Sequence, residues 1–205
     1  MPPKPKYTKE QIANTALNIV KEQGVASLSA REVAKRLGCT VSPIFTMFEN
    51  MEDLKWAARE IALKEFEDYI SDFKEYNPSF KRIGMRMISL AIHEPEVYKL
   101  LFMQERPKGH HFNDTIDELG EMTNTCISLI EKDYELTNAQ AKMLFEAMWV
   151  YAYGIGSLCA MKVCDFTEEE IANRLGQIFT GQMLLIKEGK TDLIIGLPEK
   201  KEGKL

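Results

Sequence analysis

The sequence predicts an all-α protein, and three observations support this. Apolar residues recur at spacings of three and four along almost the whole chain, as they do on the buried faces of amphipathic helices. Runs of β-branched residues, which favour strands, are few. Capping residues, glycines and prolines stand between the periodic segments, where helices begin and end. With 205 residues, 45% of them hydrophobic, the chain can bury one core or two small ones.

The first two helices have signals at both ends. Thr8 is the expected N-cap of the first helix, Gln11 follows three residues later in capping-box position, and Gly24 ends the helix. Ser29 is expected to cap the second helix and Gly38 to end it.

The third helix is predicted to be short and the fourth long. Thr40 is the expected N-cap of the third helix, and Pro43 lies in its first turn, where a missing N–H does no harm. Asn50 is expected to cap the fourth helix, with Asp53 at its third position. That helix should run to about Phe73.

Further helices are expected at about 80–92, 96–104, 113–132, 138–163 and 168–187. Thr137 and Thr167 are the expected caps of the last two. The stretch "ERPKGHH" should be a solvated loop. We expect domains at 1–50 and 51–190, followed by a flexible tail at 191–205.

The composition argues against several classes of protein. No apolar run approaches the ~18 residues of a membrane span, and "MPPKPKYTKEQ" at the N-terminus contains no stretch that could serve as a secretory signal. We therefore expect a cytoplasmic protein with no membrane partner. The cysteines form no C-x-x-C pair and have no histidine at metal-ligand spacing, so buried thiols are expected, with no metal and no cofactor. They are Cys39, Cys126, Cys159 and Cys164.

Charge is distributed unevenly along the chain. Residues 1–47 hold seven Lys and Arg against three acids, a net charge of +4, whereas the whole chain carries -5 and the remainder therefore -9. A basic segment joined to an acidic body is typical of a module that binds a polyanion, although a surface imbalance of this size can also arise by chance.

Helices two and three have the arrangement of a helix-turn-helix. In "SAREVAKRLGCTVSPIFTMF", residues 29–48, Gly38 permits a sharp turn and Val33, Leu37 and Ile44 can hold the two helices together. A helix of about two turns cannot build a core, but it fits a DNA major groove about 12 Å wide. Its leading side chains are small, so the helix can approach the bases closely.

The DNA contacts predicted from this arrangement are hydroxyls, methyls and a few cations. Arg31 could reach a guanine or a phosphate, and the small side chains could meet phosphates, base edges or thymine methyls. Phe48, in contrast, is expected to be core. The candidate DNA-binding residues are Lys9, Arg31, Thr40, Val41, Ser42, Phe45, Thr46 and Lys55.

Residues 12–54, "IANTALNIVKEQGVASLSAREVAKRLGCTVSPIFTMFENMEDL", resemble the DNA-binding domain of the tetracycline-repressor (TetR) family of transcriptional regulators. Some fifteen spaced positions agree. The segments "HEPEVYKLLF" and "MWVYAYGIGSL" also look familiar from that family. The resemblance implies a homodimer that binds double-stranded operator DNA and a small-molecule effector.

Three positions depart from the family's "Y-x-H-F-x-x-K" pattern. Phe45, Met47 and Met51 replace Tyr, His and Lys, so three polar groups that usually face phosphates are absent. Lys55, the amides that begin the fourth helix, or an N-terminal arm with Lys4, Lys6 and Lys9 could compensate. Phe45 could instead press its ring on a sugar or a thymine methyl.

Residues 80–160 are rich in methionines and aromatic side chains. Methionine adapts to irregular apolar shapes, which suits an effector pocket, although plain core packing would use the same residues. Tyrosine and tryptophan can add hydrogen bonds to an apolar wall. The candidate pocket residues are Met85, Tyr98, Phe102, Met103, Met122, Met148, Trp149 and Tyr153.

Small residues recur in the last two helices. Glycine inside a helix lowers the stability of the helix by about 1 kcal/mol relative to alanine. A close approach of two helices would explain why several glycines are nevertheless present. As the family resemblance implies, these helices would pair with those of a second subunit in a four-helix bundle. Packing inside one subunit is the alternative. The candidate interface residues are Gly154, Ser157, Gly176, Thr180 and Gly181.

Together these features predict a ligand-responsive transcriptional regulator, a repressor that binds a pseudo-palindromic operator as a homodimer and is released by an apolar or amphipathic effector. Trp56, between the head and the pocket, is the residue expected to couple them. A DNA-binding architectural protein without an effector is one alternative, and a filled body would support it. A helical enzyme is another, but the sequence offers no catalytic constellation beyond isolated carboxylates and three histidines.

Overall fold

The computed structural model describes residues 7–191. Within that range the regular structure consists of α-helices α1–α10 and two short 3₁₀ helices, η1 and η2, with no strand. The prediction of an all-α fold is therefore confirmed. Lys4, Lys6 and, apart from Thr191, the tail expected at 191–205 lie outside the described residues.

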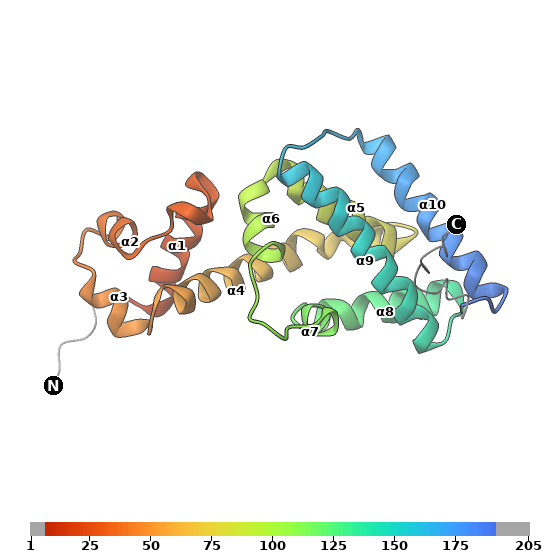
Figure 1. Ribbon diagram of the computed structural model, residues 1–205, viewed down its shortest axis with the longest axis horizontal. Coiled ribbons are helices and arrows are strands. Elements are labelled where there is room, and N and C mark those ends of the chain that lie inside the picture. The colour runs from red at the N-terminus through yellow and green to blue at the C-terminus, as the bar shows by residue number, and fades with distance from the viewer. Residues whose placement is uncertain (1–6, 192–205) are drawn as a thin grey trace, which may run out of the picture.

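The first three helices form a head at one end of the molecule (Figure 1). As expected, Thr8 and Gln11 form a reciprocal capping box, with hydrogen bonds of 3.1 and 2.9 Å. Gly38 takes a left-handed conformation with φ 63°, which glycine adopts without strain, and turns the chain after the second helix. The head comprises α1 Lys9–Gln23, η1 Val25–Ser27, α2 Ala30–Leu37 and α3 Ser42–Met47.

The start of α3 differs from the prediction. Val41, and not Thr40, is the N-cap. The backbone N–H groups of Ile44 and Phe45 both donate to the carbonyl of Val41, at 3.1 and 3.4 Å. Because Pro43 has no N–H to donate, these are the first bonds that the helix can form, and Thr40 remains in the turn before it.

Helix α4, Met51–Ile70, runs from the head into the body (Figure 1). The side chain of Asn50 accepts a hydrogen bond from the backbone of Asp53 at 2.9 Å, so the predicted cap is confirmed. The helix ends at Ile70, before the predicted Phe73, and continues as the 3₁₀ helix η2, Ser71–Glu75. Helix α4 contacts α1 on one side and α5 and α6 on the other, so its buried residues belong to a core that continues from the head into the body.

The body is a bundle arranged around α9, which packs against α5, α6, α8 and α10. By length and composition, α9 is the one helix within residues 7–191 that could cross a membrane; 39% of its apolar window is buried inside the structure. Thr137 and Thr167 cap the last two helices as predicted, and each cap is part of a capping box. The body comprises α5 Ser79–His93, α6 Pro95–Phe102, α7 Phe112–Asp117, α8 Glu121–Tyr134, α9 Asn138–Ala160 and α10 Glu168–Lys187.

Two predicted helices have different bounds in the structure. The single helix expected at 113–132 is broken into α7 and α8 at Gly120, whose φ of 58° no right-handed helix can contain. Thr123 fixes the break by donating to the carbonyl of Ile116 at 3.1 Å. The helix expected to reach Val163 ends at Ala160, because the chain turns at Lys162 with φ 55°.

Two predictions about burial have opposite outcomes. Phe48 is core, with 2% of its surface exposed, as expected. The cysteines are not uniformly buried: Cys126 is buried, Cys39 and Cys159 are partly buried and Cys164 is exposed. Cys164 follows the end of α9, in the turn that leads to α10, where no neighbouring helix covers it.

Gly156 on α9 allows close packing inside one chain, because a Cβ there would overlap the ring of Tyr98. We expect Gly156→Ala to lower the free energy of unfolding by about 1 to 3 kcal/mol, since Tyr98 is fully buried and cannot move aside. Urea denaturation measures the effect. The matched control is Gly84→Ala on α5, whose Cβ would make an ordinary 3.8 Å contact with Leu175. Equal stability of the two variants would contradict this account.

Candidate DNA-binding head and effector cavity

Buried apolar side chains pack between α2, α3 and the rest of the head and hold the turn between α2 and α3 in place. Val33 and Ala34 on α2 and Ile44 on α3 are buried together in the head. The Tyr7 hydroxyl donates to the carbonyl of Leu37 at 2.5 Å, which ties the chain before α1 to the end of α2. This support leaves the opposite side of α3 uncovered.

The uncovered side of α3 carries apolar side chains and hydroxyls. Val41 is 38% exposed and Phe45 is 48% exposed. Thr40, Ser42 and Thr46 are also exposed, so the structure brings the five predicted contact residues of this segment onto one accessible region. The hydroxyl of Thr46 donates to the carbonyl of Ser42 at 3.0 Å.

Most cations of the head already have acidic partners. Lys21 lies 2.6 Å from Glu65 and Arg36 lies 2.8 Å from Glu22. The hydrogen bond from Arg36 holds the pKa of Glu22 below its usual value. Lys35 contacts Glu32 more loosely, at 3.6 Å. These acidic partners partly neutralise the net positive charge of residues 1–47.

The three predicted cationic contacts differ from one another. Arg31 is exposed and makes no ion pair with any residue that the structure describes. The Lys9 ammonium lies 4.9 Å from the centre of the Phe48 ring. Lys55 is already 2.6 Å from Glu52, so it is the least available of the three for a phosphate.

Of the three departures from the family pattern, only Phe45 remains exposed. Met47 and Met51 are partly buried and pack against the core. Neither thioether can replace a charged or strongly hydrogen-bonding group at a phosphate.

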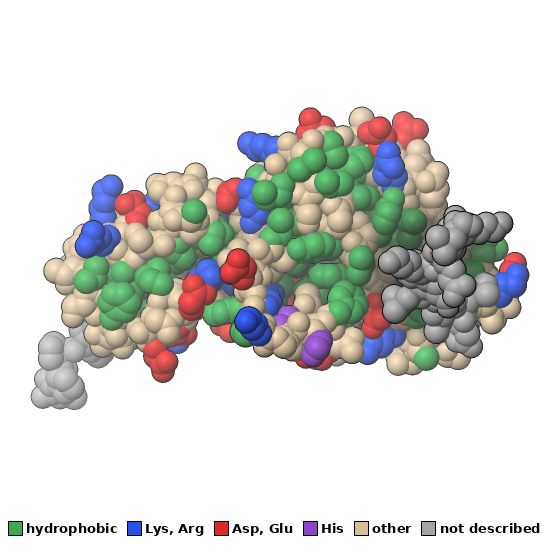
Figure 2. Space-filling model, in the orientation of Figure 1, with side chains coloured by type: hydrophobic (Ala, Val, Ile, Leu, Met, Phe, Trp, Pro, Cys, Tyr) green, Lys and Arg blue, Asp and Glu red, His purple; other side chains and the backbone are tan. Residues whose placement is uncertain are grey.

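A cavity of about 250 Å³ opens inside the body. Figure 2 shows hydrophobic side chains gathered over this part of the molecule. The wall of the cavity is mostly aromatic and aliphatic. Helix α4 and every body helix except α7 contribute to it. The largest side chains on the wall are Phe66, Phe80, Phe102, Phe145, Phe179, Tyr134 and Trp149.

Few polar groups border the cavity. Exposed Lys81 is its one cation among the described residues. The Thr180 hydroxyl donates to the carbonyl of Gly176 at 2.8 Å. Burial raises the pKa of the Cys126 thiol to about 12, and it also raises the pKa of Tyr134. Both groups are therefore neutral at pH 7, so the inner wall is uncharged.

Half of the predicted pocket residues border this cavity. Phe102, Met122, Met148 and Trp149 lie on the wall, and Met85, Tyr98, Met103 and Tyr153 do not. Tyr98 is instead packed between α6 and α9, with its hydroxyl donating to the carbonyl of Tyr153 at 3.1 Å. The Tyr153 ring stacks on Trp149 at 5.2 Å, behind the wall. Met85 and Met103 pack elsewhere against the core.

Most of the wall residues were not predicted from the sequence. The phenylalanines of α4, α5, α9 and α10 occupy inward positions of amphipathic helices, and periodicity identifies such positions as buried. Periodicity does not distinguish a side chain that fills space from one that borders a void. That difference is decided by how the helices are placed.

The predicted interface residues divide into two groups. Gly154 and Gly181 are exposed, and a Cβ added at either would meet nothing in this chain. Gly176 and Thr180 border the cavity, and Ser157 is half-buried. Helix α10 therefore contributes both to the cavity wall and to the outer surface.

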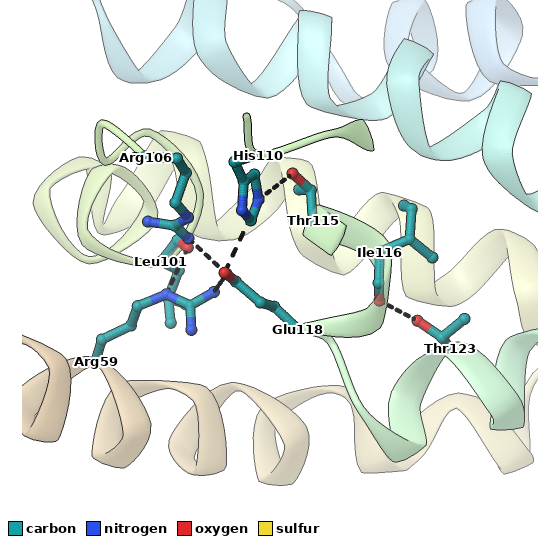
Figure 3. Close-up of polar contacts among 8 residues, drawn as sticks. All are labelled: Arg59, Leu101, Arg106, His110, Thr115, Ile116, Glu118 and Thr123. Carbon is teal, nitrogen blue, oxygen red and sulfur yellow. Dashed lines mark hydrogen bonds and ion pairs between the residues drawn. The ribbon is translucent and has the colours of Figure 1, made fainter. Parts of the chain in front are cut away.

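A cluster of charged groups connects α4 to the cavity wall (Figure 3). Arg59 on α4 is buried, and its Nε–H donates to the carbonyl of Leu101 at 3.0 Å. Its other end lies 3.4 Å from a carboxylate oxygen of Glu118. Arg106 donates to the same oxygen at 2.7 Å. We call Trp56, Arg59, Arg106, His110 and Glu118 the Arg59–Glu118 cluster.

The loop before α7 is thus less solvated than the sequence suggested. Arg106 and His110 turn inward, and His110 lies 3.0 Å from the Thr115 hydroxyl and 3.9 Å from Glu118. Trp56 lies under both guanidinium groups, at 5.1 Å from Arg59 and 4.6 Å from Arg106. Burial lowers the pKa of Arg59, and the charge of Glu118 opposes this shift.

The cluster and the cavity wall share the same backbone segments. Leu101 precedes Phe102, and Glu118 precedes Leu119. Phe102 and Leu119 border the cavity, while their predecessors bind Arg59. A ligand that moved either wall residue would therefore move a partner of Arg59.

Solved structures with the same arrangement of helices are transcriptional regulators. A TetR-like regulator from Rhodococcus sp. RHA1 matches with a TM-score of 0.61 at 11% identity, over 88% of this chain and 98% of that one. The fatty acid degradation regulator FadR from Bacillus halodurans matches with a TM-score of 0.56 at 19% identity, over 86% and 98% of the two chains. The chain has the fold of TetR-family transcriptional regulators.

A third match is the multidrug binding protein EbrR, solved in complex with imidazole, with a TM-score of 0.59 at 16% identity over 84% of this chain and 96% of that one. No protein-family model and no curated protein matches the chain in sequence. The structural matches confirm the TetR resemblance of residues 12–54 as a likeness of fold, and this likeness extends through the body.

Within this TetR fold, the Arg59–Glu118 cluster makes a prediction about stability. We expect Glu118→Gln to lower the free energy of unfolding by about 2 to 3 kcal/mol, because buried Arg59 and partly buried Arg106 would lose their shared carboxylate. Urea denaturation measures the change. Glu105→Gln, an exposed residue with no ion pair among the described residues, is the matched control and should change stability by less than about 0.5 kcal/mol.

Proposed function

We propose that the protein is a ligand-responsive transcriptional repressor of the TetR type, which binds a pseudo-palindromic operator as a homodimer and is released by a small apolar or amphipathic effector. The observation that carries the proposal is the combination, in one TetR fold, of an exposed α3 on the head and a cavity in the body. We further propose a cytoplasmic location, where operator DNA is accessible.

The head supports DNA binding through its shape and its exposed groups. Helix α3 is six residues long, short enough to lie in a major groove about 12 Å wide. Exposed Arg31 in the first turn of α2 can contact a phosphate or a base edge, and Lys9, at the start of α1, supplies a second cation over the Phe48 ring. The head therefore offers groups for contacts with phosphates, which position the protein on DNA, and for contacts with base edges, which specify the sequence.

The outer faces of α9 and α10 support a homodimer. Val150 and Leu158 on α9, and Met161 directly after its last residue, are between 39% and 55% exposed, and Gly154 stands between Val150 and Leu158 at helical spacing. Leu184 on α10 is 55% exposed beside the open position Gly181. Paired helices would bury these side chains, and a twofold axis would place two α3 helices about one DNA turn, or ~34 to 36 Å, apart or somewhat more.

The cavity supports an effector with a largely apolar body. Its aromatic and methionine wall can adapt to several shapes, and Lys81 can pair with an anionic end of the ligand. Among the structures with this fold, one is a regulator of fatty acid degradation and another is a multidrug binding protein. Apolar and amphipathic molecules are the class that this chain's own wall favours.

The Arg59–Glu118 cluster supports a route from the cavity to the head. Effector contact with Phe102 or Leu119 would shift the Leu101 carbonyl or Glu118, and buried Arg59 would follow its partners. Arg59 is part of α4, which packs against α1 of the head. The effector would thus stabilise a body conformation in which the two heads no longer fit the operator.

The two other classes of function have less support. An architectural protein without an effector would have a filled body, and the body of this chain contains a cavity. An enzyme would need a catalytic or metal constellation, and residues 7–191 contain no cluster of three or more His, Cys, Asp or Glu that could hold a metal ion. Several structures with the same fold are regulators.

The first test concerns the head. We expect Arg31→Ala with Thr40→Ala to weaken DNA binding roughly 10- to 100-fold, because two groups that face the duplex are lost. Fluorescence anisotropy at fixed salt measures binding to duplexes that the wild-type protein has enriched from a random pool. Lys132→Ala, an exposed cation on α8, is the control for lost charge. Unchanged affinity of the double variant, with the dimer intact in sedimentation, would contradict the assignment of α3 as the reading helix.

The second test concerns the cavity. We expect Ala152→Phe, a buried wall position on α9, to fill part of the space and abolish binding of the apolar fluorescent probe N-phenyl-1-naphthylamine. DNA binding should survive. Ala139→Phe, at an exposed position on the same helix, is the control. Probe binding by the Ala152→Phe variant at wild-type strength would place the effector site elsewhere.

A further inference from the structure

We propose that α3 reads its operator through the C5-methyl groups of thymines, with Phe45 and Val41 as the specificity-determining residues. This inference rests on the proposed function and specifies the class of DNA that the head recognises. Its starting point is a segment of eleven residues, 38–48, that contains no charged side chain and no side-chain amide.

The composition of this segment removes the usual means of reading purines. Guanine is recognised by Arg or Lys and adenine by Asn or Gln, each through two hydrogen bonds to one base edge. No residue of α3, or of the turn before it, can form such a pair. Only the hydroxyls of Thr40, Ser42 and Thr46 are available, and the hydroxyl of Thr46 already donates a hydrogen bond to the carbonyl of Ser42 at 3.0 Å.

The exposed apolar groups of α3 fit a different feature of the major groove. Val41 and Phe45 are four residues apart, so they lie on the same side of the helix, and they are 38% and 48% exposed. Their neighbour Ile44 is fully buried and Phe48 nearly so, which fixes the side of α3 that faces away from the head. The one apolar group that a base pair presents in the major groove is the thymine methyl.

Charge and fold indicate DNA as the partner of this apolar surface. Arg31, an exposed cation with no ion pair among the residues that the structure describes, stands in the first turn of α2. The head has the fold of helix-turn-helix regulators. A duplex provides phosphates for such a cation and methyl groups for the apolar side chains at the same time.

The experiment begins with a selection by the full-length protein from random 30-base-pair duplexes. The enriched duplex is then synthesised in four forms at each thymine of the common half-site: thymine, uracil, cytosine and 5-methylcytosine, each with its complementary base. Thymine and uracil differ only by the methyl group, whereas 5-methylcytosine restores the methyl on a different base pair. Anisotropy at fixed salt gives the dissociation constants.

We expect uracil at one or two positions of each half-site to weaken binding about fourfold per methyl, which corresponds to the roughly 0.8 kcal/mol gained on burying a group of this size. Restoring the methyl as 5-methylcytosine should recover affinity relative to cytosine at the same positions. Phe45→Ala and Val41→Ser should lose the preference for thymine over uracil. Ile92→Ala, which removes an exposed apolar side chain on α5, should keep the full preference.

Equal binding of the thymine and uracil duplexes would overturn the inference and leave the proposed function standing. The same holds if Phe45→Ala weakens both duplexes equally, since its ring would then contact a sugar. It would also be overturned if Phe45→Ala changed the oligomeric state without DNA, because the surface would then be an interface between copies of the chain. Failure to enrich any duplex would contradict the proposed function itself.

Discussion

The buried guanidinium of Arg59 must keep its hydrogen-bond and charge partners, and this requirement ties α4 to the body. Arg59 belongs to α4, and its partners are a backbone carbonyl at the end of α6 and the carboxylate of Glu118 after α7. Arg106 shares that carboxylate, and one of its own nitrogens is buried without a hydrogen-bond partner among the described residues. Two cations thus depend on one acid, so the position of α4 is tied to segments that also form the cavity wall.

Helix α10 also takes part in two regions of the molecule, the cavity wall and the outer surface. Its inner side borders the cavity through Gly176 and Thr180, while its outer side leaves Gly181 open and Leu184 exposed. If the outer side pairs with a second subunit, a ligand in the cavity lies one helix thickness from the dimer axis. Because packed helices move as units, a change in the wall would, in the proposed dimer, reach the partner subunit and, by the proposed route through Arg59, the head.

Sequence patterns predicted well those elements whose ends are set by local chemistry. The caps of α1, α4, α9 and α10 are hydrogen bonds between a side chain and a backbone N–H three residues later, so neighbours in the chain are sufficient to specify them. The break at Gly120 was missed because an isolated glycine inside a helical pattern is tolerated and does not by itself mark the end of a helix. The start of α3 was misplaced by one residue because it depends on which carbonyl the first available N–H groups can reach.

The sequence by itself determined the helical periodicity, the head with its helix-turn-helix and the apolar composition of α3, since each is a property of consecutive residues. Only the tertiary structure decided which apolar side chains border the cavity, why Tyr98 fills space beside Gly156 instead of lining it, and that Arg106 and His110 turn inward to meet Glu118. These outcomes depend on contacts between segments far apart in the chain. Periodicity records whether a side chain is buried, but the partner it is buried against is set by how the helices pack.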